Sequence, residues 1–231
     1  WVLSGSKMWI TNGSVADLAI VWARTDDGIR GFIVPTDSPG FQANVIHHKV
    51  SLRASITSEL VFDDVRLPGD ALLPEATSLG APLRCLNEAR FGIAFGTMGA
   101  ARECLETALD YAATREQFDR PISGFQLTQR KLVDMAVELN KGMLLALRLG
   151  RLKDAGRITP EQVSAGKLNN AREALNIARE CRAILGGSGI TLEYPVIRHM
   201  NNLESVYTYE GTNEMHTLVI GQALTGISAF R

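Results

Sequence analysis

The chain has 231 residues, enough for one large domain or two ordinary domains with a substantial core. Its 24 Lys and Arg residues nearly balance its 25 Asp and Glu residues, which makes nucleic-acid binding a poor hypothesis. No apolar run is long enough to span a bilayer, and the first residues do not resemble a signal peptide. Because the chain opens on Trp1 within a strand-like segment, we expect it to be the later part of a longer protein.

Neither the cysteines nor the histidines predict a metal site. Cys85, Cys104 and Cys181 lie far apart and form no CxxC pair. We therefore expect buried thiols in a reducing compartment, rather than a disulfide framework or a zinc site. His47 and His48 are adjacent, and adjacent side chains on a strand point to opposite faces. Surface or core histidines are the simpler interpretation.

The first third of the chain predicts strands. Short runs of β-branched and aromatic residues occupy residues 9–11, 18–22, 31–34 and 60–62. Turn formers such as Asn12-Gly13 separate these runs, and Pro68 and Pro74 mark their end. The pattern predicts a small antiparallel, β-barrel-like domain over residues 1–77.

The remainder predicts helices. Apolar residues recur every three or four positions over residues 79–113 and 127–153. A capping box with proline at the first helical position, Thr159-Pro160-Glu161-Gln162, starts a third helix that we expect to reach Leu185. Shorter helices follow from about Val196 and Thr212. Long helices with short connections predict an antiparallel four-helix bundle over residues 78–231 and an α+β fold class overall.

Two glycine clusters lie in the helical part. Gly92, Gly96 and Gly99 fall near one side of the first predicted helix, where they would let another helix or a ligand come close, and we favour packing. Gly186-Gly187-Ser188-Gly189 ends a helix and follows no strand, so it lacks the context of a dinucleotide fingerprint. We interpret it as a helix C-cap.

The stretch from Tyr207 to Glu214 lies between the last two predicted helices and places Glu210 beside Gly211. A glycine lets backbone or ligand approach closely. An apolar loop disfavours the charged form of a glutamate, raises its pKa and suits it to act as a base near neutral pH. The alternative interpretation is a solvated acidic turn that leads into a helix.

Four blocks of residues resemble the acyl-CoA dehydrogenase family in sequence and in order. They are Trp9-Ile10-Thr11-Asn12, Arg115-Glu116-Gln117-Phe118, Leu185-Gly186-Gly187 and Tyr209-Glu210-Gly211-Thr212. Within that family the chain is most similar to the glutaryl-CoA dehydrogenases, on the residues 85–92, 149–154 and 197–227. The resemblance covers essentially the whole chain.

The resemblance implies a flavoprotein whose FAD lies between a middle β domain and the C-terminal bundle, after an N-terminal helical domain that this chain lacks. It also implies a homotetramer, because some residues that match the family's FAD site hold the cofactor of a neighbouring subunit. The cofactor residues that it implies are Trp9, Ile10, Thr11, Arg115, Phe118, Gln126, Ala183, Ile184, Leu185, Gly186, Gly187 and Thr212. Some relatives carry glutamine at the position of Ala183, so only main-chain contacts carry over there. Taken singly, Trp9 and Phe118 are typical core aromatics and Arg115 a typical surface charge.

By the same resemblance, Glu210 is the base that removes the α-proton of an acyl thioester while the β-hydrogen leaves as hydride to the flavin. The backbone N–H of Glu210 and a flavin hydroxyl would stabilise the enolate oxygen. The implied substrate-binding residues are Leu83, Leu86, Asn87, Arg90, Tyr209 and Gly211. Some relatives carry the base immediately before the arginine that matches Arg90, but here Ala89 occupies that position and cannot ionise.

For a glutaryl substrate, the resemblance implies loss of CO2 to give crotonyl-CoA, with electrons passed to an electron-transfer flavoprotein. The arginine that would grip the γ-carboxylate is expected outside this chain. The alternatives are a short-chain acyl-CoA dehydrogenase without decarboxylation, an acyl-CoA oxidase, and a non-catalytic helical scaffold. The expected compartment is the cytoplasm of a bacterium or the mitochondrial matrix of a eukaryote.

Overall fold

The computed structural model describes residues 1–230, which form two compact units. The first unit runs from Trp1 to Cys85, and the second begins at Leu86. Helix α1 (Gly80–Thr114) contributes its first residues to the first unit. The predicted domain border after residue 77 stays a prediction.

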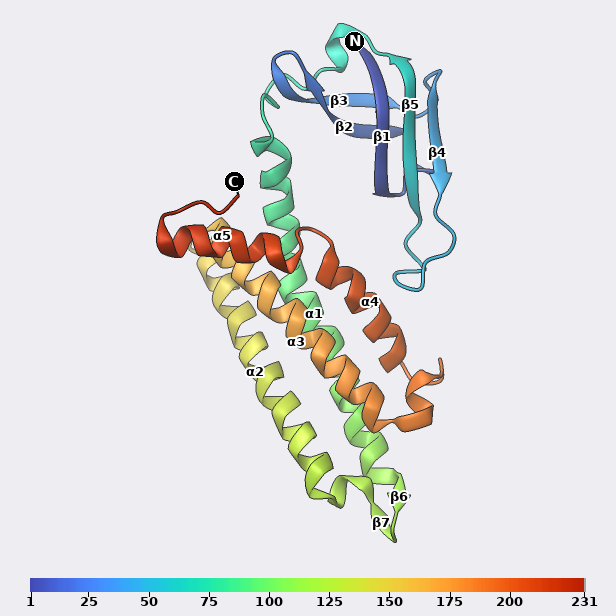
Figure 1. Cartoon of the computed structure of the whole chain (residues 1–231), viewed down its shortest axis with the longest axis vertical. Helices are drawn as coiled ribbons and strands as arrows, with labels where there is room; N and C mark the ends of the chain where they lie inside the picture. Colours follow the sequence, from blue (N-terminus) through green and yellow to red (C-terminus); the bar gives the residue numbers. More distant parts are fainter. Residues whose placement is uncertain (231) are drawn as a thin grey trace. The chain divides into compact units, whose positions relative to one another are not determined.

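The first unit is built of antiparallel strands (Figure 1). Strand β5 (Thr57–Arg66) lies between β1 (Val2–Thr11) and β4 (Phe41–Val45). Strands β2 (Leu18–Thr25) and β3 (Gly28–Pro35) form a separate hairpin, and a short 3-10 turn, η1 (Gly69–Ala71), follows β5. The antiparallel sheets confirm the predicted fold class, but the described strands do not close into a barrel.

Alternation along β5 shows how these sheets bury their apolar side chains. Leu60, Phe62 and Val65 are buried, whereas the carboxylates Asp63 and Asp64 are exposed. This is the pattern of a strand with one face on a core. The core of the unit consists of Leu3, Val21, Phe32, Val34, Leu60, Phe62, Val65, Leu67 and Ala71.

The second unit confirms the predicted helical bundle. Helices α1, α2 (Gln126–Asp154), α3 (Pro160–Ile184) and α4 (Val196–Thr208) run up and down beside one another, and α5 (Asn213–Thr225) crosses one end (Figure 1). At the other end, the small hairpin of β6 (Glu116–Gln117) and β7 (Arg120–Pro121) leads through η2 (Ile122–Gly124) into α2, and η3 (Gly186–Ile190) joins α3 to α4. Helix α3 is central, since it packs against α2, α4 and α5.

Local signals set the ends of these helices. The capping box at Thr159 is present as predicted, because Gln162 Oε1 accepts from the Thr159 backbone N–H at 3.1 Å. Gly186 has φ +58° after the end of α3, which confirms the C-cap interpretation. Among the described residues, no helix combines the length and the apolar composition that a bilayer crossing needs.

Two expectations about small residues are met only in part within the described residues. A Cβ on Gly92, Gly96 or Gly99 would have no neighbouring atom within 4 Å, so these glycines do not serve packing within the described chain. Of the three cysteines, Cys104 and Cys181 are buried, but Cys85 lies in the first turns of α1 and is exposed. An exposed position there leaves the Cys85 thiol accessible, whereas burial raises the pKa of the Cys104 thiol to about 12.

Candidate active site

Glu210 lies in the short connection between the end of α4 at Thr208 and the start of α5 at Asn213. The backbone turns sharply there, with φ +53° at Glu210 and +96° at Gly211. A left-handed conformation costs a non-glycine residue about 1–2 kcal/mol, so the surroundings must hold Glu210 in it. Thr212 then caps α5, because its hydroxyl accepts from the Met215 backbone N–H at 3.4 Å.

Two cationic side chains hold this turn by its carbonyl oxygens. Arg90 Nε donates to the Glu210 carbonyl at 2.6 Å, and Arg90 Nη1 donates to Asn87 Oδ1 at 3.1 Å. Lys167, which is fully buried on α3, donates from Nζ to the Gly211 carbonyl at 2.8 Å and to the Tyr207 carbonyl at 3.1 Å. The backbone of the turn is thus anchored to both α1 and α3.

The carboxylate of Glu210 is left free by this arrangement. Its Oε2 is buried and has no hydrogen-bond partner among the described residues. Burial raises the pKa of Glu210, and the nearby charges of Arg90 and Lys167 partly offset that rise. A partly buried carboxylate with a raised pKa and no partner can accept a proton from a bound molecule. This geometry differs from that of a fully solvated acidic turn.

Two further residues at the turn, His216 and Tyr209, also have shifted pKa values. His216 on α5 is 2% exposed, and burial together with Lys167 and Arg90 lowers its pKa to about 4. A Cβ on Gly211 would lie 3.0 Å from His216 Nε2, so the imidazole packs directly against the turn. Burial and the charge of Glu210 raise the pKa of Tyr209. At neutral pH the His216 imidazole is therefore uncharged, and it packs against one side of the turn.

The position that precedes Arg90 has no role as an alternative base in this chain. Ala89 is exposed, and Glu88 forms an ion pair with Lys153 on α2. Glu88 is therefore engaged away from the turn. Within the described residues, Glu210 is the carboxylate that Arg90 and Lys167 both face.

The implied substrate residues fall into two groups. Arg90, Tyr209 and Gly211 lie at the Glu210 turn, and Asn87 joins them through its hydrogen bond to Arg90. Leu86 is half-buried one turn before Arg90 on α1. Leu83 is exposed and belongs to the first unit.

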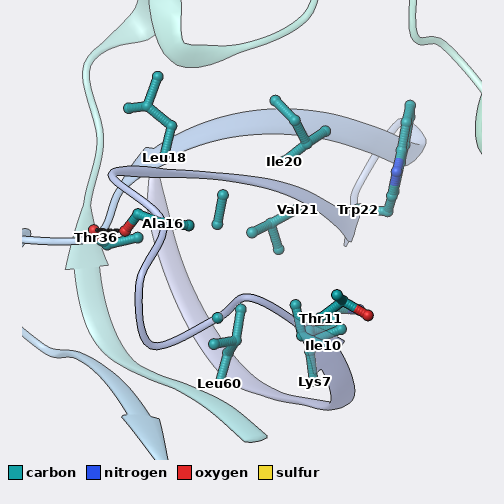
Figure 2. Close-up of a pocket in the computed structure, with 12 residues that line it drawn as sticks. Lys7, Ile10, Thr11, Ala16, Leu18, Ile20, Val21, Trp22, Thr36 and Leu60 are labelled. Atoms are coloured by element: carbon teal, nitrogen blue, oxygen red, sulfur yellow. Dashed lines mark hydrogen bonds between the residues drawn. The ribbon is translucent and has the colours of Figure 1, made fainter. Parts of the chain in front are cut away.

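The implied cofactor residues of the first unit lie at the end of β1. Trp9 has φ +65° and is 65% exposed. Ile10 and Thr11 instead line a cavity of about 280 Å³ between β1 and the β2–β3 hairpin. Figure 2 shows Lys7, Ile10 and Thr11 at one end of this cavity and Leu18 and Thr36 at the other.

The implied cofactor residues of the second unit gather at the end of the bundle that carries the β6–β7 hairpin. Phe118, which is 87% exposed, lines a cavity of about 360 Å³ together with Ala183 and Ile184. Arg115 and Gln126 are exposed and adjoin this region in sequence, as do Gly186 and Gly187. Leu185 differs, because its side chain is buried in the helical core and only its backbone is available.

Sequence reasoning missed several residues of these sites. Lys167 and His216 are buried beside the turn, yet neither was expected there. The signal for Lys167 is its helical spacing from the buried Val163 and Ala174, which places a lysine at a core position. Six further residues line the cavity at Phe118, namely Gln117, Ile122, Phe125, Leu127, Thr128 and Lys131.

Comparison with known proteins identifies the family. The family model described as acyl-CoA dehydrogenase, C-terminal domain, matches residues 79–225, and the model of the middle domain matches residues 1–65. The chain belongs to the acyl-CoA dehydrogenase family.

Within the described residues, no group of three or more His, Cys, Asp or Glu side chains could hold a metal ion.

Several acyl-CoA dehydrogenases are similar over most of the chain. A glutaryl-CoA dehydrogenase from Mycobacterium smegmatis is 75% identical with a TM-score of 0.98, covering 100% of this chain and 60% of that one. A second structure from the same organism, described as in complex with FADH2, is 69% identical with a TM-score of 0.97 at the same coverage. The mitochondrial short-chain specific acyl-CoA dehydrogenase of Bos taurus is 37% identical over 95% of this chain. The chain spans 55% of that relative.

Proposed function

We propose that the full-length protein is an FAD-dependent dehydrogenase that converts glutaryl-CoA to crotonyl-CoA and CO2. The observation that carries this proposal is the Glu210 carboxylate, which is partly buried and unpartnered at Oε2, on a turn whose backbone carbonyls accept hydrogen bonds from Arg90 and Lys167. The high identity to glutaryl-CoA dehydrogenases supports the choice of substrate.

In the proposed reaction, Glu210 accepts the α-proton of the thioester. Its raised pKa brings the carboxylate closer to the range in which a base works near neutral pH. The enolate oxygen that forms needs a donor, and the backbone N–H of Glu210 is the candidate in this chain. Gly211 has no side chain, which lets the turn pack against His216, and we propose that the thioester lies beside it. FAD, when bound, would supply the acceptor for the β-hydrogen, which leaves as hydride.

For glutaryl-CoA the chemistry continues after the dehydrogenation. The bond to the γ-carboxylate breaks, CO2 leaves, and its electron pair forms a dienolate. Protonation of that dienolate gives crotonyl-CoA. The protonated Glu210 is a suitable donor for this step, since it holds the proton that it removed.

The residues present fit FAD. The Trp9 side chain is exposed, so its aromatic ring is available to stack on the planar flavin ring. Phe118 and Lys131 line the cavity at the hairpin end of the bundle, which combines an aromatic side chain with a cation for a nucleotide. Arg115 adds a guanidinium suited to a pyrophosphate. We further propose that Thr212 contacts the cofactor, and that the hairpin-end residues hold the FAD of a neighbouring subunit in a homotetramer.

A second candidate function is the dehydrogenation of a short acyl-CoA without decarboxylation. The 37% identity to the short-chain enzyme of Bos taurus favours it, although the two Mycobacterium smegmatis glutaryl-CoA dehydrogenases are about twice as identical. The two candidates differ in whether a γ-carboxylate is bound, and this chain spans 60% of the glutaryl-CoA dehydrogenase that it resembles. The full-length protein is therefore required to separate them.

The test is to assay the full-length protein with carboxyl-labelled glutaryl-CoA and, in parallel, with butyryl-CoA. We expect labelled CO2 and crotonyl-CoA in equal amounts, and slower turnover of butyryl-CoA. Glutaconyl-CoA without CO2, or faster turnover of butyryl-CoA, would contradict decarboxylation and favour the second candidate. A preparation without flavin absorbance would indicate a non-catalytic scaffold, and oxygen consumption without an added acceptor would indicate an oxidase.

We propose that an electron-transfer flavoprotein accepts the electrons. The compartment stays a prediction, namely the cytoplasm in a bacterium or the mitochondrial matrix in a eukaryote. Reduction of a purified electron-transfer flavoprotein by the substrate-reduced enzyme would test whether that protein accepts the electrons.

A further inference from the structure

Lys167 is a fully buried lysine on α3, beside the Glu210 turn. It lies on the face of α3 that also buries Val163 and Asn170. A lysine side chain is almost never fully buried unless polar groups accept hydrogen bonds from its ammonium. Here the polar groups are two backbone carbonyls, those of Tyr207 and Gly211. Burying an ammonium group costs free energy. Its hydrogen bonds to these two carbonyls therefore indicate that the position of the turn is important to the protein.

The two carbonyls flank Glu210 on either side. The Tyr207 carbonyl belongs to the last turn of α4, where the helix leaves carbonyl groups without intrahelical partners. The Gly211 carbonyl lies one residue after Glu210, at the start of the path into α5. One ammonium group therefore joins the entry and the exit of the left-handed turn. Arg90 holds the remaining carbonyl, that of Glu210 itself.

We propose that Lys167 is a positioning residue for proton abstraction, which fixes the Glu210 turn by its two flanking carbonyls and leaves the carboxylate free to face the substrate. This inference rests on the proposed function of Glu210 as the base. Among residues 1–230, no ion pair joins the Lys167 ammonium to the Glu210 carboxylate. The lysine thus orders the backbone without occupying the carboxylate oxygens.

The charge of Lys167 has a second effect on the base. The charged and titratable groups that face it are Glu210 in the turn, Arg90 on α1 and His216 on α5. Burial lowers the pKa of Lys167 to about 8, an effect that Glu210 opposes and Arg90 reinforces. The ammonium in turn lowers the pKa of Glu210. Without it, the pKa of Glu210 rises further and less of the carboxylate is ionised at neutral pH.

The test compares Lys167→Met with the wild type in the full-length flavoprotein. Methionine fills a similar volume but has neither charge nor donor. We expect kcat per bound flavin to fall roughly 10- to 100-fold at neutral pH, with a much smaller change in KM. The acidic limb of the kcat profile moves to higher pH, which a merely structural role does not predict. Lys167→Arg, which keeps the charge, should leave that limb in place.

The matched control is Lys141→Met, since Lys141 is an exposed lysine on α2 that pairs with Glu138. It should behave as the wild type. If Lys167→Met does not fold, Lys167→Gln replaces it, because glutamine also removes the charge and should move the acidic limb in the same direction. An unchanged kcat and an unchanged acidic limb in the neutral variant would overturn the role of Lys167.

The outcome for the wild type separates this inference from the function on which it rests. A wild type that turns over no acyl-CoA contradicts the proposed function. An active wild type with an equally active Lys167→Met variant contradicts only the positioning role.

Discussion

Replacing Gly211 by alanine tests whether the geometry of the Glu210 turn controls the reaction. Gly211 has φ +96°, beyond the left-handed region that other residues tolerate. A Cβ there would lie 3.0 Å from His216 Nε2 and 3.1 Å from His216 Cε1. The imidazole is buried, so it has little room to retreat. The turn itself must therefore shift.

The expected magnitude follows from two contributions. The backbone conformation costs about 1–2 kcal/mol for an alanine, and overpacking against a buried side chain costs about 1–3 kcal/mol. A shift of the turn by a few tenths of an ångström would also disturb the bond from Arg90 Nε to the Glu210 carbonyl. Since small misplacements of a catalytic group lower rates steeply, we expect kcat to fall roughly 10- to 100-fold.

The assay is steady-state turnover of the full-length flavoprotein with thermal unfolding measured in parallel. The matched control is Gly221→Ala on α5, because a Cβ on Gly221 would have no neighbouring atom within 4 Å. Alanine favours a helix by about 1 kcal/mol over glycine, so this control should be neutral or slightly stabilising. If kcat of Gly211→Ala stays within about twofold of the wild type, the turn does not control the reaction as described.

Two further predictions concern stability. The pKa of His216 is lowered to about 4, so between about pH 6.5 and pH 4 the unfolded chain binds a proton that the folded chain does not, and stability falls as pH falls. We expect a loss of about 2 kcal/mol from neutral pH to about pH 4.5 that is absent in His216→Gln, measured by denaturant unfolding; parallel pH profiles would contradict it. Gly40→Ala should destabilise the first unit by about 2–4 kcal/mol, because its Cβ would lie 2.1 Å from the Asp63 carbonyl oxygen at φ +89°. Gly69→Ala, with no neighbouring atom within 4 Å, is the control, and equal melting temperatures of the two variants would refute the prediction.

The helices were predictable because their signals are local. The capping box at Thr159 and the C-cap at Gly186 depend on neighbouring residues alone, and both are present. Closure of a sheet depends instead on pairing between distant strands, so the strand signals predicted the antiparallel sheets of the first unit but could not show that the described strands stay open. Strand β4 was also missed, because Phe41–Val45 is short and only its pairing with β5 makes it a strand.

The candidate site was predictable where a motif carries the chemistry. Glu210 beside Gly211 indicated a carboxylate with a raised pKa, and its pKa is raised. Lys167 was not found, because a search for chemical motifs passes over a lysine in the middle of a helix. The cavity at Phe118 was found only in part, since it combines the β6–β7 hairpin with residues of α2 and α3 that lie far apart in the sequence.

The central claim is that the Glu210 carboxylate removes the α-proton. The most direct measurement is the rapid reduction of the bound flavin by glutaryl-CoA in Glu210→Gln, followed by its absorbance in a stopped-flow instrument. Glutamine keeps the size of the side chain but is a poor base, so we expect full flavin content and a reduction rate lower by roughly 10²- to 10⁴-fold. Flavin reduction at nearly the wild-type rate in this variant would contradict the account.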